Sequence, residues 1–304
     1  MPNDPRALDY SIVDVFTTQA LSGNPLAVVM NTVGLTTAQM QAIAREFNLS
    51  ETTFVERRPA DIEAAEGIRV RIFTTLEELP FAGHPTLGTA SVLRLVAPET
   101  LRGSTITLAE NVGPIPVEFP QPGASFAEMT QRDPEFGPEL SPSDVARLCS
   151  LSVDDLDPSA PPQVVSTGTA FAIVLLRSVE ALGRLRVHHD QATPFLRAHG
   201  ARWFYVVAPA PGENAENGMQ CFRTRMQFYG AEDPATGSAA GCAVSYLVQR
   251  KVAPSGTRFL LRQGVEMGRP SDIFVSAQAA GARVTQIRVA GSTVLVAKGT
   301  FFLP

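Results

Sequence analysis

The chain of 304 residues contains little cysteine, little lysine and no long apolar run. Its three cysteines, Cys149, Cys221 and Cys242, are odd in number and have no CxxC spacing. This argues against a disulfide framework and against a zinc site, and we expect reduced, buried thiols. No stretch approaches the roughly 18 consecutive apolar residues of a membrane span. The polar start, Met1–Pro5, is not followed by a signal-peptide core, so we expect a cytoplasmic protein without a membrane partner.

Basic residues are neither numerous nor clustered. Lysine and arginine total 25, only Lys251 and Lys298 are lysines, and the formal net charge is −5. A nucleic-acid partner is therefore not expected. The P-loop and the Gly-x-Gly-x-x-Gly motif are also absent, so no nucleotide cofactor is expected, and no ligand cluster indicates a metal. Hydrophobic residues make up 44% of the chain, and its length predicts two globular domains.

What the sequence does contain is an internal repeat. The segment His84–Ala90 matches Asp233–Ala239 at an offset of 149 residues (233 − 84), and both read (His/Asp)-Pro-x-x-Gly-(Thr/Ser)-Ala. Upstream, Ser22–Val29 resembles Thr167–Val174; downstream, Thr105–Leu108 resembles Phe259–Arg262. Matched landmarks in one order predict a duplication. We expect an N-terminal module over residues 1–120, with residues 294–304 packing back onto it, and a C-terminal module over 121–304.

Local signals predict an α+β fold of two similar domains. The helices expected after the matched motifs, Leu87–Val96 and Ala239–Val248, are apolar on nearly every face and must be enclosed. Each domain is therefore expected to be a curved mixed sheet wrapped around a central helix. Thr36 and Gln39 have the spacing of a capping box, and Ser141-Pro142 has the form of another helix start. The Pro-rich stretch 114–123 is the expected linker.

Three titratable residues are candidates for catalysis. If the matched helix starts converge on one cleft, His84 and Asp233 lie on opposite walls, where backbone N–H groups suit a substrate carboxylate. Asp before Pro is also a good helix cap, whereas His is not. The second repeat has no carboxylate at the position near Ala201 that matches Glu51. Glu51 therefore stands alone, and its carboxyl group suits a general acid and base. Its plain alternative is an exposed glutamate at a strand start.

The motifs that contain these residues resemble one family. They are Asn48–Phe54, Glu78–Pro85 and Glu232–Ala239, with further matches at Gly23-Asn24-Pro25 and Gln263–Ser271. From about Tyr10 to Phe302 the chain resembles the PhzF family of phenazine-biosynthesis-like proteins. The resemblance implies a diaminopimelate-epimerase-like fold with the active site between two similar domains. It also implies a cofactor-independent isomerase like that of trans-2,3-dihydro-3-hydroxyanthranilate.

The resemblance also implies residue roles. A glutamate matching Glu51 moves a proton between ring carbons, assisted by residues matching His84 and Asp233. Residues matching Ser50, Gly83, Gly237 and Ser238 bind the substrate. Two loops that would border the cleft, Thr75–Glu77 and Met226–Ala231, depart from the family pattern and affect which substrate fits. We expect a small-molecule substrate, no cofactor, no metal and a homodimer.

Other readings of the same residues compete with this one. Related racemases use two cysteines at such helix starts, but here the cysteines lie elsewhere in the sequence. A protein of this fold that binds a small molecule without turnover, or an epimerase or racemase of an amino-acid-like substrate, stays open. For the anion, the competing view is that Arg71 or Arg225 supplies a positive charge.

Overall fold

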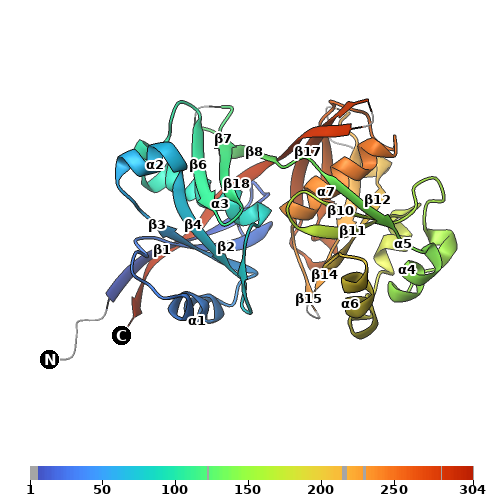
Figure 1. The fold of residues 1–304 in the computed structure, drawn as a ribbon, viewed down its shortest axis with the longest axis horizontal. Coiled ribbons are helices and arrows are strands. Elements are labelled where there is room, and N and C mark those ends of the chain that lie inside the picture. The colour runs from blue at the N-terminus through green and yellow to red at the C-terminus, as the bar shows by residue number, and fades with distance from the viewer. Residues whose placement is uncertain (1–5, 122, 214–217, 229–230, 282, 304) are drawn as a thin grey trace. The chain divides into compact units, whose positions relative to one another are not determined.

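The computed structural model describes residues 6–121, 123–213, 218–228, 231–281 and 283–303 (Figure 1). The chain forms two compact units: Met1–Met129 with Ala290–Pro304, and Thr130–Val289. The sequence predicts a division after residue 120 and the return of residues 294–304 to the first module. In the structure the division follows Met129, and the returning segment begins at Ala290.

The first unit is a mixed sheet whose strand order closes on itself. The order is β1-β2-β3-β4-β6-β7-β8-β18, and β1 also pairs with β18. The pairs β2–β3 and β4–β6 are parallel, whereas β1–β2, β3–β4 and β6–β7 are antiparallel. The elements are β1 (Arg6–Val15), β2 (Asn24–Val29), α1 (Thr37–Phe47), β3 (Glu51–Glu56), α2 (Ala60–Glu66), β4 (Ile68–Phe73), β5 (Glu78–Leu79), α3 (Gly83–Val96), β6 (Thr105–Glu110), β7 (Gly113–Glu118), β8 (Phe126–Gln131) and β18 (Arg283–Leu303).

The second unit has a sheet with the same series of pairings. The order is β17-β16-β13-β12-β11-β10-β9. Here β11–β12 and β13–β16 are parallel, whereas β10–β11, β12–β13 and β16–β17 are antiparallel. The elements are β9 (Glu135–Glu139), α4 (Pro142–Leu148), β10 (Gln163–Ser166), β11 (Ala170–Leu175), α5 (Val179–Gly183), α6 (His189–Ala198), β12 (Trp203–Pro209), β13 (Cys221–Arg225), β14 (Gln227–Phe228), β15 (Ala231–Glu232), α7 (Gly237–Gln249), β16 (Phe259–Gln263) and β17 (Ser271–Ala280).

One helix in each unit is enclosed by strands, as its apolar faces predict. Helix α3 contacts β1, β2, β3, β6 and β7, and α7 contacts β10, β11, β12 and β17 (Figure 1). Every residue of α7 from Gly237 to Val248 is buried. A helix without a polar face is stable only when it is covered on all sides, and these strands cover it. The fold is therefore α+β.

Local capping signals are confirmed, but the predicted linker is wrong. Thr36 and Gln39 form the capping box of α1, and Ser141 caps α4 with Pro142 at its first position. The first half of the Pro-rich stretch belongs to strand β7, which pairs with β6. Its prolines, Pro114 and Pro116, are exposed and alternate with inward-facing apolar residues, so the strand accommodates them on one face.

The three cysteines are free and buried, as expected. Burial raises the pKa of Cys149 to about 12 and the pKa of Cys221 and Cys242 to about 11. None of them lies at the start of α3 or α7, so a two-thiol base pair is not present there. Within the described ranges, no helix is long and apolar enough to cross a membrane.

Candidate active site

Helix α3 begins at Gly83 without a side-chain cap. Its N-cap residue, Ala82, is extended, with φ −151° and ψ 136°, and makes no side-chain cap hydrogen bond. Pro85 lies in the first turn, where its missing N–H costs little. The N–H groups of Gly83 and His84 therefore lie at the positive end of the helix dipole. This is where the sequence predicts that an anion binds.

His84 lies beside Glu51, the first residue of β3. The distance between His84 Nε2 and Glu51 Oε2 is 3.5 Å, and the two side chains are 3% and 13% exposed. Strand β3 places Glu51 there through its parallel pairing with β2, in which Leu26 lies opposite Glu51. The first unit thus brings together two of the three predicted catalytic residues.

Asn24 sets the tautomer of His84. The amide nitrogen of Asn24 lies 3.2 Å from His84 Nδ1. An amide nitrogen only donates, so Nδ1 accepts and the neutral ring carries its proton on Nε2. Burial lowers the pKa of His84 to about 3, because a buried site disfavours the imidazolium. Near pH 7 the contact with Glu51 is therefore a polar contact of a neutral ring, not an ion pair.

Asp233, the third predicted catalytic residue, is held in the second unit at the turn before α7. Its carboxylate Oδ2 accepts a hydrogen bond of 2.6 Å from Thr236 Oγ1, and its N–H donates to the Met226 carbonyl. The residue is only 6% exposed. The side chain is thus oriented by Thr236, the N-cap residue of α7.

Gln263 and Tyr205 brace the same turn. Gln263 Nε2 donates to the Asp233 carbonyl at 2.8 Å, and its Oε1 accepts from the Thr236 N–H at 3.1 Å. Tyr205 donates to Gln263 Oε1 at 3.0 Å. All of these groups are buried, so the network fixes the turn firmly. Neither Tyr205 nor Gln263 is among the predicted site residues, because strands from distant parts of the chain bring them to this turn.

The predicted substrate-binding residues divide between the units. Ser50 and Gly83 belong to the first unit, next to Glu51 and His84. Gly237 and Ser238 are the first two residues of α7, and both are buried. Helix α7, like α3, has no side-chain cap hydrogen bond.

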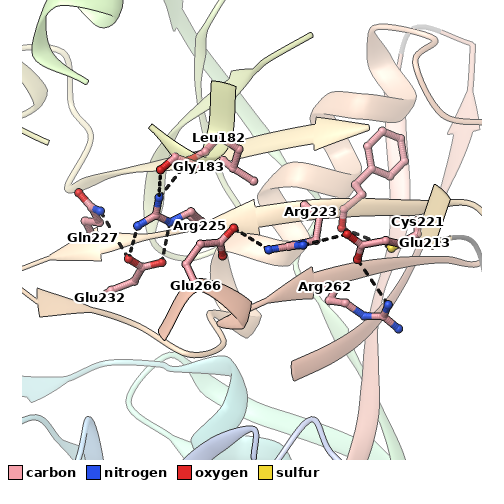
Figure 2. A network of polar contacts seen from close by, with 11 residues as sticks. Leu182, Gly183, Glu213, Cys221, Arg223, Arg225, Gln227, Glu232, Arg262 and Glu266 are labelled. Carbon is pink, nitrogen blue, oxygen red and sulfur yellow. Dashed lines mark hydrogen bonds and ion pairs between the residues drawn. The ribbon is translucent and has the colours of Figure 1, made fainter. Parts of the chain in front are cut away.

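The two arginines proposed as alternative anion sites have carboxylate partners. Arg71 binds both oxygens of Glu78, at 2.8 and 2.5 Å. Arg225 binds both oxygens of Glu232, at 2.8 and 2.6 Å, and also donates to the carbonyls of Leu182 and Gly183 (Figure 2). Bidentate pairs of this kind occupy the fork of the guanidinium. Glu78 and Glu232 thus occupy the positions that a substrate anion would take on these arginines, and the helix starts stay the predicted anion site.

These ion pairs also correct the alignment of the two halves. Arg71 corresponds to Arg225, Glu78 to Glu232, and the helix start Gly83 to Gly237, each at an offset of 154 residues (225 − 71, 232 − 78 and 237 − 83). The matching of His84 with Asp233 is therefore wrong. His84 corresponds to Ser238, and Asp233 to Leu79. The downstream match of Thr105–Leu108 with Phe259–Arg262 already had the offset of 154.

The two loops predicted to affect substrate choice, Thr75–Glu77 and Met226–Ala231, lie a few residues before these helix starts. In the first unit Thr74 closes the turn, because its hydroxyl accepts from the N–H groups of Leu76 and Glu77. In the second unit Gln227–Phe228 pairs with Ala231–Glu232 as β14 and β15. Tyr229 and Gly230 lie outside the described residues.

Among the described residues, no group of three His, Cys, Asp or Glu side chains has the geometry to hold a metal.

Comparison with known proteins places this chain among isomerases. Residues 13–299 match the family described as phenazine biosynthesis-like protein. A relative from Mesorhizobium japonicum, named as an uncharacterized isomerase, is 36% identical over 97% of this chain and 99% of its own length. The trans-2,3-dihydro-3-hydroxyanthranilate isomerase of Pseudomonas aeruginosa is 35% identical over the same shares. A solved structure described as a predicted epimerase, also from Pseudomonas aeruginosa, has a TM-score of 0.80 and 34% identity, covering 97% of this chain and 99% of that one.

Proposed function

The chain belongs to the phenazine biosynthesis-like family and is an isomerase, and from this premise we propose that it moves a proton between carbon atoms of a small, cyclic carboxylate without a cofactor. The observation that supports this most is the buried pair of Glu51 and His84, with the His84 Nε2–H beside the Glu51 carboxyl group. A relative is named for trans-2,3-dihydro-3-hydroxyanthranilate, and we propose a substrate of that class.

Glu51 is the proton carrier in this proposal. Its carboxylate takes a proton from a ring carbon next to a C=C bond. The electrons of that C–H bond form a new double bond to the adjoining carbon, and the electrons of the original double bond move to its far carbon. The resulting acid, which can exchange its hydrogen with water, gives a proton to that far carbon. No electron or proton is gained overall, so no redox partner is needed. Neutral His84 donates through Nε2 and orients the carboxyl group, a role that needs the tautomer fixed by Asn24.

The carboxylate of the substrate is proposed to bind at the helix starts. Both starts lack a side-chain cap, and backbone N–H groups at such a start bind anions without a positive side chain. Ser50 and Ser238 are proposed to add hydroxyl donors. Asp233 is proposed to bind an amine or hydroxyl of the substrate, because Thr236 orients its carboxylate toward accepting hydrogen bonds.

We also propose that the two units arose by duplication. The support is the same order of parallel and antiparallel pairs around one enclosed helix, and the repeated Arg–Glu pair beside each helix start. A homodimer in the cytoplasm stays an expectation from the sequence. Light scattering on the purified protein and cell fractionation would test these two points.

The test of the function is turnover in heavy water. Wild-type protein is incubated with trans-2,3-dihydro-3-hydroxyanthranilate, and NMR follows the loss of each ring C–H signal and the gain of deuterium. We expect an isomerised product with solvent deuterium at the newly protonated carbon, to the extent that the Glu51 acid exchanges its hydrogen with water before it protonates the substrate. We expect the same rate after dialysis against a chelator. Deuterium uptake at one carbon without movement of the double bond would instead indicate an epimerase. Binding without any exchange would indicate a protein that has the fold but no turnover.

A further inference from the structure

A second buried carboxyl group lies next to the first turn of α3. Glu110 is the last residue of β6 and is 5% exposed. Its Oε1 lies 2.6 Å from Thr86 Oγ1, and Thr86 Oγ1 lies 2.7 Å from the Ala82 carbonyl. Glu110 Oε2 is buried without a hydrogen-bond partner among the described residues. The chain of contacts thus runs from Glu110 through Thr86 to the N-cap residue of the helix that carries His84.

Counting protons assigns one to Glu110. The Thr86 hydroxyl has a single hydrogen, and both of its short contacts reach oxygen atoms. The Ala82 carbonyl can only accept, so it takes the Thr86 hydrogen. The contact between Glu110 and Thr86 then needs a hydrogen from the carboxyl group. A buried oxygen without a partner is also less costly on a neutral acid than on a carboxylate.

The charges around Glu110 agree with this count. From β4, Arg69 acts on Glu110, but its guanidinium donates to the Ala109 carbonyl and to Asn111. From β7, the residue opposite Glu110 is Gly113, which has no charge. Burial is the largest cause and raises the pKa of Glu110 to about 8. Other charged groups on elements that contact β6 have partners of their own: Glu63 and Glu66 of α2 with Arg57 and Arg58, Arg71 of β4 with Glu78, and Arg94 of α3 with the Ala124 carbonyl. Asp61 of α2 and Glu118 of β7 are exposed to solvent, and His84 of α3 is neutral.

We propose that Glu110, as a neutral acid, is a positioning residue that braces the first turn of α3 and keeps that helix start free of negative charge. Because it concerns the anion site at Gly83-His84, this inference rests on the proposed function. A carboxylate at Glu110 would accept the Thr86 hydrogen, break the bond from Thr86 to Ala82, and compete with a substrate anion for the positive end of α3.

The first experiment needs no substrate. Infrared difference spectra between neutral and alkaline pH are recorded for wild type, Glu110→Gln and the control Glu118→Gln, which changes an exposed glutamate on the same hairpin. We expect a protonated-carboxyl band that is lost as the pH rises through about 8, is absent in Glu110→Gln and is kept in Glu118→Gln. A spectrum of Glu110→Gln identical to that of wild type would overturn the inference, whatever the fate of the proposed reaction.

The second experiment measures the anion site. Anthranilate and its uncharged analogue anthranilamide serve as probes, titrated at pH values below and above the pKa of Glu110. Wild type should bind anthranilate about three- to tenfold more weakly at the higher pH, the scale of a charge at a helix start. Glu110→Gln keeps a donor to Thr86 and should lose this pH dependence, whereas anthranilamide binding should not change. If anthranilate affinity declined equally with pH in wild type and in Glu110→Gln, the inference would be wrong. If the protein still isomerised its substrate in that case, the proposed function would stand without the role of Glu110.

Discussion

The helix starts of the two units have the same supports but different polar partners. Each follows a bidentate Arg–Glu pair, Arg71 with Glu78 and Arg225 with Glu232, and each lacks a side-chain cap. After the first pair comes His84, whose Nε2 lies near Glu51. After the second comes Asp233, which is bound by Thr236. The Arg–Glu pairs, which both units share, support the fold. The polar residues that differ make the start of α3 suited to proton transfer and the start of α7 suited to accepting hydrogen bonds.

The two carboxyl groups also differ in what holds them. Glu51 lies beside a neutral ring that burial keeps uncharged, with its side chain 13% exposed. Asp233 is fixed on one oxygen by Thr236, and its backbone is held by Gln263. A proton carrier must change its protonation state during the reaction, and the contact of Glu51 with a neutral N–H group suits that role. The braced Asp233 suits an unchanging acceptor.

The largest effect is expected at Glu51. Glu51→Gln keeps the size of the side chain but cannot carry a proton, so kcat should fall by about three orders of magnitude. Steady-state kinetics on the substrate found by deuterium exchange measures this. The control is Glu56→Gln, at the other end of the same strand. A Glu51→Gln rate near that of wild type would mean that another group moves the proton.

The next effect separates the two helix starts. His84→Phe should lower kcat by about a hundredfold, because it removes the N–H donor beside the carrier. Asp233→Asn keeps the bond from Thr236 but loses the charge, and it should raise KM by about tenfold while lowering kcat less. Kinetics over a range of substrate concentrations separates the two constants. If both variants lowered kcat equally with KM unchanged, the division of roles between the starts would be wrong.

The shared supports should matter for stability rather than chemistry. Arg225→Met leaves the half-buried Glu232 without its arginine. The side chains of Arg225 and Glu232 are 9% and 14% exposed, whereas those of Arg71 and Glu78 are 15% and 23% exposed. We expect the free energy of unfolding to fall by about 3–5 kcal/mol for Arg225→Met, and by less for Arg71→Met. Urea unfolding measures both. A larger loss for Arg71→Met would contradict this ranking.

Per unit of pH change, Glu110 gives the smallest expected effect, a dependence of stability on pH. Its pKa is raised in the folded chain from 4.5 to about 8, so the folded state holds a proton that the unfolded state releases. The stabilisation is complete below pH 4.5 and is lost as the pH rises through about 8, by at most about 1.4 kcal/mol per pH unit. Urea unfolding across this range should show the decline in wild type and a smaller one in Glu110→Gln. Parallel curves would contradict it.

Features fixed by short stretches of sequence could be predicted, whereas those set by distant contacts could not. The capping box of Thr36 and Gln39 was found because both groups lie within one helical turn. The enclosed helices were found because their composition leaves no polar face. The match of His84 with Asp233 was misleading, since a proline and a glycine recur near both motifs; the Arg–Glu pairs that reveal the true offset form between strands.

The missed site residues have the same explanation. Asn24 stands in the matched motif Gly23-Asn24-Pro25 without a predicted role, and only the approach of α3, 60 residues later, lets it set the His84 tautomer. Gln263 and Glu110 end strands whose neighbours come from other parts of the chain. The prolines of β7 led to the prediction of a linker. A strand can accommodate prolines on its exposed face, but the pairing with β6 that makes this segment a strand is not visible in the composition.

The state of His84 tests the central claim most directly, because it requires no substrate. The ¹⁵N chemical shifts of its imidazole, assigned with His84→Gln, are followed by NMR from about pH 5 to pH 8. The structure predicts a neutral ring throughout, with the proton on Nε2, because its pKa is lowered to about 3 and Nδ1 accepts from Asn24. A ring that titrates within this range, or one that carries its proton on Nδ1, would contradict the assignment of a neutral donor beside Glu51.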